Sequence, residues 1–236
     1  MFYSLLILQI IAHIISDYYL QTDVIAENKN KKGFLSKYLY IHFVITLLVS
    51  WILSFRINFF WAALLIAVLH TIIDGVKKHF KKNKYIFFID QIVHLAILTG
   101  ITAYYYYHCD SNKTLIPIPD TKFLLLSLGL LIIFKPANIL IKQIFQLYNI
   151  EITEEREDLK NAGKLIGNTE RLLILIFVLL NQFEVVGFLL AAKSILRFKD
   201  TETSKTEYVL TGTLLSFSIA IIIGIIIVKL IRQNIF

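Results

Sequence analysis

The architecture of this chain is most evident in residues 59–76, which read FFWAALLIAVLHTIIDGV. The segment is apolar over almost the whole length that a helix needs to cross a bilayer, roughly 20 residues. His70 and Asp74 near its end are the exceptions, and they lie four residues apart, so that one face of a helix presents both. The segment therefore predicts a transmembrane helix that carries a polar pair at one end.

Similar apolar segments recur along the 236-residue chain. Seven candidate spans, which predict an all-α polytopic bundle, run over residues 2–20, 38–55, 59–76, 86–107, 122–147, 171–192 and 207–231. The fifth contains Lys135-Pro136-Ala137-Asn138, and we expect a kink or break there because proline lacks the helix donor. At this length we expect one bundle rather than separately folded domains, with a four-span membrane domain over residues 1–107 and a C-terminal membrane extension over 108–236.

The composition argues against a soluble protein and against a nucleic-acid partner. Hydrophobic residues make up 57% of the chain and charged residues 17%, whereas soluble domains average about 45–50% and about 25%. The formal net charge of +7 comes from Lys and Arg between apolar segments, which is typical of loops that face anionic lipid headgroups. Membrane lipids are therefore the expected partners, and assembly into a homo-oligomer is left open.

The basic residues predict an orientation for the first half of the chain and a conflict in the second. They gather between residues 20 and 38 and again at 77–84, which places these loops in the cytoplasm and the N-terminus outside. The loop after residue 192 is also basic although it should lie outside, so that either the sixth apolar segment is re-entrant or the number of spans differs. Glu184, deep in that segment, is expected to pair with Arg171 or Lys193.

The most polar stretch of the chain is residues 150–170, IEITEEREDLKNAGKLIGNTE. Its apolar residues recur at helical spacing, which favours a short amphipathic helix at the membrane interface. A solvated linker explains the same composition equally well.

Four histidines and three aspartates gather in the first four spans. Six of them form three pairs with helical i,i+4 spacing: His13 with Asp17, His70 with Asp74, and Asp90 with His94. His42 has no such partner. Because successive spans are antiparallel, all seven residues are expected in one layer near the cytoplasmic side. Such a layer can bind one or two metal ions, form a proton or ion pathway, or make a structural hydrogen-bond network.

Imidazole and carboxylate groups are good ligands for divalent metals, with zinc favoured. The candidate ligands are His13, Asp17, His42, His70, Asp74, Asp90 and His94. Asp17, Asp74 and Asp90 are also the candidate catalytic groups. Simpler interpretations make Asp90 the N-cap of the fourth span, expose Asp74 to solvent, and treat Lys77 as an ordinary cytoplasmic lysine. Gln21 and Gln91 fall beside the cluster, where they either orient ligands or lie at the interface.

The motifs themselves carry a resemblance, which is clear over residues 1–105. The segments are HIISDYYLQTD (13–23), AENK (26–29), HFVIT (42–46), HTIIDGVK (70–77) and DQIVH (90–94). They resemble a bacterial membrane family catalogued only as a domain of unknown function, and later segments such as NAGKLIGNTERLLIL (161–175) resemble the extension of its longer members. The resemblance implies a multi-pass protein of the bacterial inner membrane. The arrangement of His and Asp is also similar to membrane-bound metal-dependent hydrolases and, more loosely, to ceramidase-like zinc hydrolases.

These observations predict a metal-dependent hydrolase that acts on a lipid or lipid-linked substrate at the cytoplasmic side. One alternative is a transporter of ions, protons or small solutes, in which the cluster forms a relay and the broken fifth span contributes Lys135 and Asn138. The other is a structural or regulatory subunit whose polar layer only specifies packing.

Overall fold

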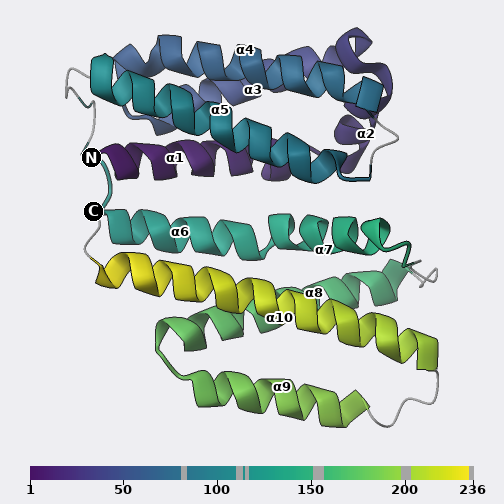
Figure 1. Ribbon diagram of the computed structural model, residues 1–236. Helices are drawn as coiled ribbons and strands as arrows, with labels where there is room; N and C mark the ends of the chain where they lie inside the picture. Colours follow the sequence, from purple (N-terminus) through teal and green to yellow (C-terminus); the bar gives the residue numbers. More distant parts are fainter. Residues whose placement is uncertain (81–83, 110–113, 115–116, 151–156, 198–202, 234–236) are drawn as a thin grey trace. The chain divides into compact units, whose positions relative to one another are not determined.

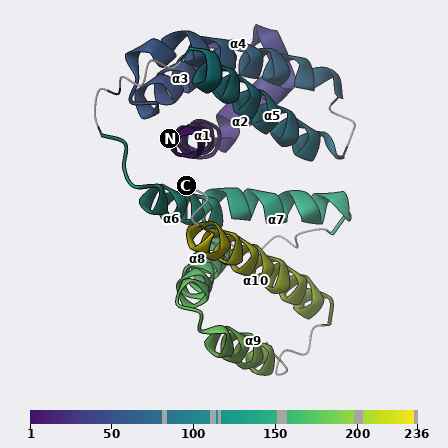
Figure 2. The same cartoon turned by 60° about the vertical axis from the view of Figure 1, so that its left-hand side comes forward.

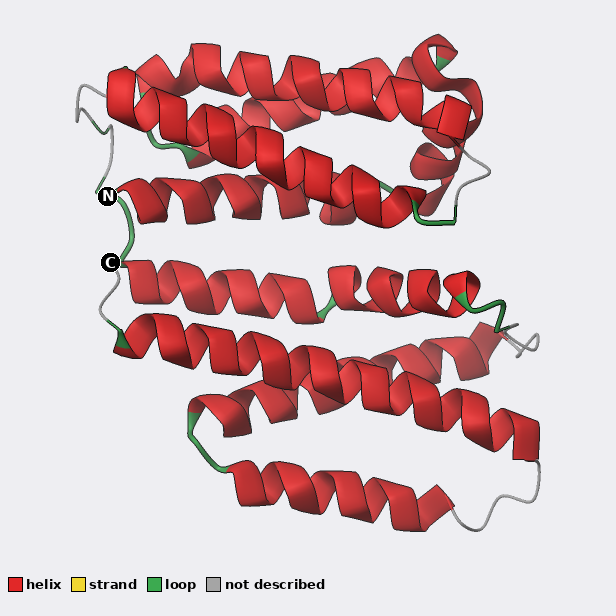
Figure 3. Cartoon of the chain, viewed as in Figure 1, coloured by secondary structure: helices red, strands yellow, loops and turns green. Residues whose placement is uncertain are grey.

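The computed structural model describes residues 1–80, 84–109, 114, 117–150, 157–197 and 203–233, and this part of the chain is helical with no strand (Figure 1 and Figure 3). The predicted all-α fold is confirmed. The helices are α1 (Phe2–Ile14), α2 (Asp23–Lys32), α3 (Lys37–Leu53), α4 (Phe60–Val76), α5 (Ile86–His108), α6 (Thr121–Ile133), α7 (Lys135–Leu147), α8 (Glu157–Leu179), α9 (Phe183–Arg197) and α10 (Thr203–Arg232). The chain divides into two compact units, Met1–Leu128 and Gly129–Ile235.

The first unit is built around four long helices. Each of α1, α3, α4 and α5 contacts two of the others, so that the chain returns from α5 to α1 and closes a bundle. The short helix α2 lies across one end of this bundle, where it contacts α3 and α4 (Figure 2). At the other end the interior is an apolar cluster, formed by Leu5, Phe59, Ala63, Ile66 and Tyr105.

Helix α4 shows how apolar and polar side chains are distributed between the outside and the interior of the bundle. Its exposed side chains are large and apolar and recur at helical spacing: Trp61, Leu65, Val68 and Ile72. Apart from Ile66, its buried side chains are small or polar: Ala63, Ala67, His70 and Asp74. An apolar exterior around a polar interior is the arrangement of a helix that faces lipid, because water would favour the reverse.

Four helical segments are long and apolar enough to cross a membrane: Phe2–Tyr19, Ile57–Phe80, Ile86–His108 and Val209–Arg232. Two bent pairs of helices raise the number to as many as six: α2 and its following turn with α3, bent by 107°, and α6 with α7, bent by 42°. The chain is therefore a membrane protein, while the predicted count of seven spans is not confirmed.

Two differences from the predicted spans come from turns. The predicted loop between the first two spans contains helix α2. Thr22 caps the N-terminus of this helix, and its hydroxyl accepts a hydrogen bond from the Ile25 amide. The predicted sixth span over 171–192 is wrong, because α8 ends at Leu179 and α9 begins at Phe183. Asn181 between them has a φ of 57°, and the Gln182 amide bonds the Phe177 carbonyl, which is the Schellman ending of a helix.

The polar stretch 150–170 is not a separate helix. It is helical from Glu157, and α8 continues without interruption to Leu179, whereas residues 151–156 lie outside the described part. The expected partnership of Glu184 is also wrong, because Glu184 is exposed and Lys193 bonds Glu170 instead.

The predicted break in the fifth span is confirmed, since α6 ends at Ile133 and α7 begins at Lys135. Arg171 of α8 is buried at this break, where its Nε donates to the Ile133 carbonyl at 2.5 Å. Its other nitrogens donate to neutral oxygens of Asn138, Asn168 and Ser216. The guanidinium therefore satisfies a carbonyl at the break and ties α7, α8 and α10 together within the second unit.

Gly33 fixes α2 to the base of α4. It has a φ of 58°, and a Cβ atom there would lie 2.9 Å from the Gly75 carbonyl oxygen. We predict that Gly33→Ala lowers the free energy of unfolding by about 1–3 kcal/mol through backbone strain and this clash. Thermal unfolding in detergent measures the change. The control is Gly100→Ala in α5, where a Cβ meets nothing within 4 Å, and a Gly33 variant as stable as this control would contradict the prediction.

Candidate metal centre

The seven predicted residues come together at the end of the first unit that α2 covers. Six of them are buried, and Asp17 is partly buried, with 12% of its side chain exposed. His13 lies in the last turn of α1, and Asp17 in a π-helical turn, Ile15–Tyr19, that continues it. Single π turns inside helices are frequent at functional sites, because they redirect side chains without ending the helix. Ser16 holds this turn by donating to the His13 carbonyl and to Asp17.

Three atoms from three helices form a nearly equilateral triangle. His42 Nε2 lies 3.0 Å from His70 Nε2, and Asp17 Oδ1 lies 3.3 Å from the first and 3.4 Å from the second. Two ligands of a tetrahedral ion with bonds of about 2.0 Å lie roughly 3.3 Å apart. The triangle therefore has the size of one face of a tetrahedral coordination sphere.

Asp74 lies near the fourth corner. Its Oδ2 is 3.8 Å from His42 Nε2 and 3.7 Å from His70 Nε2. The carboxylate is buried rather than exposed to solvent, which rules out the simpler interpretation of this residue.

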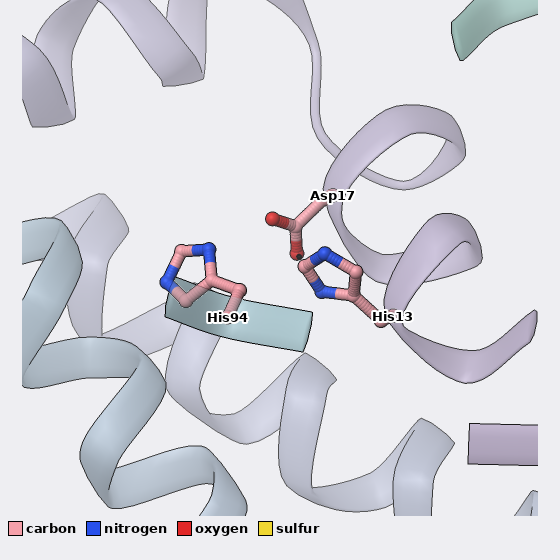
Figure 4. Close-up of side chains that lie close together, drawn as sticks. All are labelled: His13, Asp17 and His94. Carbon is pink, nitrogen blue, oxygen red and sulfur yellow. Dashed lines mark ion pairs between the residues drawn. The ribbon is translucent and has the colours of Figure 1, made fainter. Parts of the chain in front are cut away.

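His13, one turn before Asp17 in the same helical segment, lies beside the Asp17 carboxylate, and His94 of α5 lies across from both (Figure 4). The three residues offer one ligand atom each within 4.8 Å of one another, and His13 Nδ1 lies 3.6 Å from Asp17 Oδ1. The ring of His94 also stacks on that of His70, with centroids 4.1 Å apart. Asp17 is thus common to two groups of potential metal ligands.

Asp90 lies at the edge of this arrangement. Its Oδ2 accepts from Lys77 Nζ at 2.7 Å and from Gln91 Nε2 at 3.3 Å, and lies 3.9 Å from His94 Nδ1. None of the three potential ligand groups found among the described residues includes Asp90. Helix α5 begins at Ile86 with Tyr85 as its N-cap, so Asp90 is not a cap, and Lys77 is an ion-pair partner rather than a plain surface lysine.

Sequence reasoning missed Lys29. This lysine of α2 is buried and its ammonium bonds Asp74 Oδ2. It lies in the run NKNKK (28–32), where nothing in local composition separates it from the exposed Lys31 and Lys32. The AENK segment quoted for the resemblance contained it, and that was the only signal in the sequence.

The charges of the pocket do not balance among the described residues. Asp74 bonds Lys29 and Asp90 bonds Lys77, whereas Asp17 has only imidazoles and the Ser16 hydroxyl around it. An isolated carboxylate in a low-dielectric interior is expensive unless a cation compensates it. The site therefore fits a bound cation at Asp17 in both its charge and its donor atoms.

A cavity of about 10 Å³ lies beneath the histidines. His13, His70 and His94 line it together with Thr46, and Gln9 and Ser50 bond to each other on its far side. This volume holds about one water molecule. Ile66 of the apolar cluster and Leu98 also line the cavity.

The site lies entirely within the part of the chain that resembles known sequences. Residues 5–121 match the family model described as "Protein of unknown function (DUF3307)". No curated protein and no solved structure matches the chain. All seven predicted residues and Lys29 fall inside the matched range.

The Lys29–Asp74 pair generates a stability prediction. Lys29→Met leaves a buried carboxylate without its ammonium, which should lower the free energy of unfolding by about 3–5 kcal/mol. The double variant Lys29→Met/Asp74→Asn should recover most of this loss, as measured by thermal unfolding in detergent.

The matched control is Lys31→Met, two residues along the same helix, because Lys31 and Glu27 form an exposed pair. Its effect should be within about 0.5 kcal/mol. Equal effects of the two lysine substitutions would show that Lys29 does not compensate Asp74.

Proposed function

Residues 5–121 belong to the DUF3307 family of proteins of unknown function, and from the His/Asp centre within them we propose that this membrane protein is a metal-dependent hydrolase of a lipid or lipid-linked substrate. The observation that carries the proposal is the triangle of His42, His70 and Asp17 with edges of 3.0–3.4 Å. Three protein ligands and one open position are typical of catalytic zinc, whereas structural zinc is closed by four.

The fourth position belongs to water in this proposal. A bound divalent ion lowers the pKa of such a water to near 7 and polarises the phosphoryl or acyl oxygen that it attacks. Asp74 lies beside that position, 3.7 and 3.8 Å from the two imidazole nitrogens, and it is the general base that accepts the water proton. Lys29 fixes the orientation of the Asp74 carboxylate through their hydrogen bond.

The surroundings of the pocket support a substrate at the headgroup level of a membrane. The pocket lies at the end of the bundle, and the lysines around that end are exposed: Lys31, Lys32, Lys37, Lys78 and Lys84. Such residues attract anionic lipid headgroups.

Metal content tests the centre directly. We predict that protein purified in detergent without chelator carries stoichiometric divalent metal, and that His70→Ala loses it. His79→Ala is the matched control, because His79 is an exposed histidine in the turn after α4. Only trace metal in the wild-type protein would contradict the proposal.

Hydrolysis is tested with one lipid that contains both a phosphate ester bond and acyl ester bonds. Mixed micelles of dioleoyl phosphatidic acid release inorganic phosphate if the phosphoryl group is attacked and oleate if an acyl group is attacked. We predict that Asp74→Asn lowers the rate of product release by about 10²–10⁴-fold, as expected when a general base is removed. Unchanged turnover in Asp74→Asn would remove this residue from the mechanism.

A further inference from the structure

We infer that the pocket holds two metal ions rather than one, with Asp17 as a bridging ligand and His13 and His94 as the ligands of the second ion. This inference rests on the proposed metal-dependent hydrolase and makes its substrate class narrower. It assigns a role to two histidines that the triangle of His42, His70 and Asp17 does not use.

The first support is a set of buried nitrogen atoms without hydrogen bonds. Among the described residues, His13 Nε2 and both ring nitrogens of His94 have no hydrogen-bond partner, and the two residues are 6% and 3% exposed. Buried polar groups are nearly always paired, and each unmade hydrogen bond costs about 1–3 kcal/mol. A cation that each ring ligates through one nitrogen would give both histidines a partner inside this cluster of carboxylates.

The second support is the way in which the ligand groups overlap. Two of the three groups are Asp17, His42 and His70, and His13, Asp17 and His94. These two share Asp17 alone, so that each ion would receive two histidines and one carboxylate. The third group, His70, Asp74 and His94, takes one histidine from each of them and places Asp74 within reach of both ions. A carboxylate has two oxygens with about four lone-pair sites, which suffices to bridge two ions. Helical bundles with two metals use shared and inward-facing carboxylates in this manner.

The spacing of the second group requires only small movements. Its three ligand atoms lie within 4.8 Å of one another, compared with roughly 3.3 Å for ligands of a tetrahedral ion. Each atom therefore moves inward by less than about 1 Å, which rotation of the His13 and His94 rings supplies. Figure 4 shows both rings and the Asp17 carboxylate turned toward the same space.

The charge of a two-metal pocket favours a phosphate ester as substrate. Two divalent ions with Lys29 and Lys77 exceed the three carboxylates of the pocket by three positive charges. A phosphate dianion reduces that excess from three charges to one, whereas a neutral acyl ester leaves it unchanged. Paired metals also stabilise both the attacking and the leaving oxygen of a displacement at phosphorus.

The reaction is then hydrolysis of a lipid phosphate monoester. The oxygen of water bonds to phosphorus while the bond from phosphorus to the lipid oxygen breaks. Asp74 accepts one proton of the water and passes it to the leaving lipid oxygen, while the other proton stays on the new phosphate oxygen, so that a lipid alcohol and hydrogen phosphate leave.

Manganese binding separates this inference from the proposed function. Detergent-purified protein is stripped with chelator and reloaded with Mn²⁺. We expect two ions per chain and a spin-coupled electron paramagnetic resonance spectrum in the wild-type protein. His94→Ala should bind one ion and give the uncoupled six-line signal, and Thr102→Val, two turns further along α5 and also buried, should resemble the wild-type protein.

Each other outcome is decisive. A single ion in the wild-type protein, unchanged in His94→Ala, would overturn the second site and leave the proposed function standing. Two ions without spin coupling would overturn the Asp17 bridge. No bound ion in the wild-type protein would overturn both proposals, and because the wild-type spectrum decides these cases, they do not depend on whether His94→Ala folds.

Discussion

A carboxylate in an apolar membrane bundle needs a positive partner, and this requirement organises the first unit. Asp74 forms an ion pair with Lys29, and this pair holds helix α2 across the end of the bundle. Asp90 forms an ion pair with Lys77, which lies in the turn after α4. Asp17 alone is left to imidazoles, and the π turn that carries it directs its carboxylate toward three of them. The proposed metal centre follows from that one uncompensated charge.

The same constraint explains why the polar side chains lie at one level of the bundle. Apolar side chains cover the outside of α4, and an apolar cluster lies at the end of the bundle opposite the histidines. The end that α2 and the exposed lysines surround is the one nearest the His/Asp pocket. A hydrolase of membrane lipids needs its site near such an end, because its substrate presents the scissile bond at the headgroup level while its tail remains in the lipid.

The sequence predicted the polar layer because i,i+4 spacing and antiparallel spans are sufficient to align His13, His42, His70 and His94. It did not predict Lys29, because a buried lysine in a run of lysines differs from its neighbours only through a residue 45 positions away, Asp74. The break at Lys135-Pro136 could be predicted from proline chemistry. The turn at Asn181 was missed because Leu180 and Phe183 continue an apolar pattern, although asparagine is a common residue at such a helix end and the Asn181 and Gln182 amides close the turn on Val178 and Phe177. Local patterns therefore predict the helices and their ends, while the ion pairs depend on partners distant in sequence.

Anomalous X-ray diffraction from crystals grown without chelator, recorded on both sides of the zinc edge, would locate the proposed ion. We expect an anomalous peak between His42 Nε2, His70 Nε2 and the Asp17 carboxylate. Crystals grown with added zinc that show no peak there, and in which His42 and His70 are simply hydrogen-bonded to each other, would contradict this expectation.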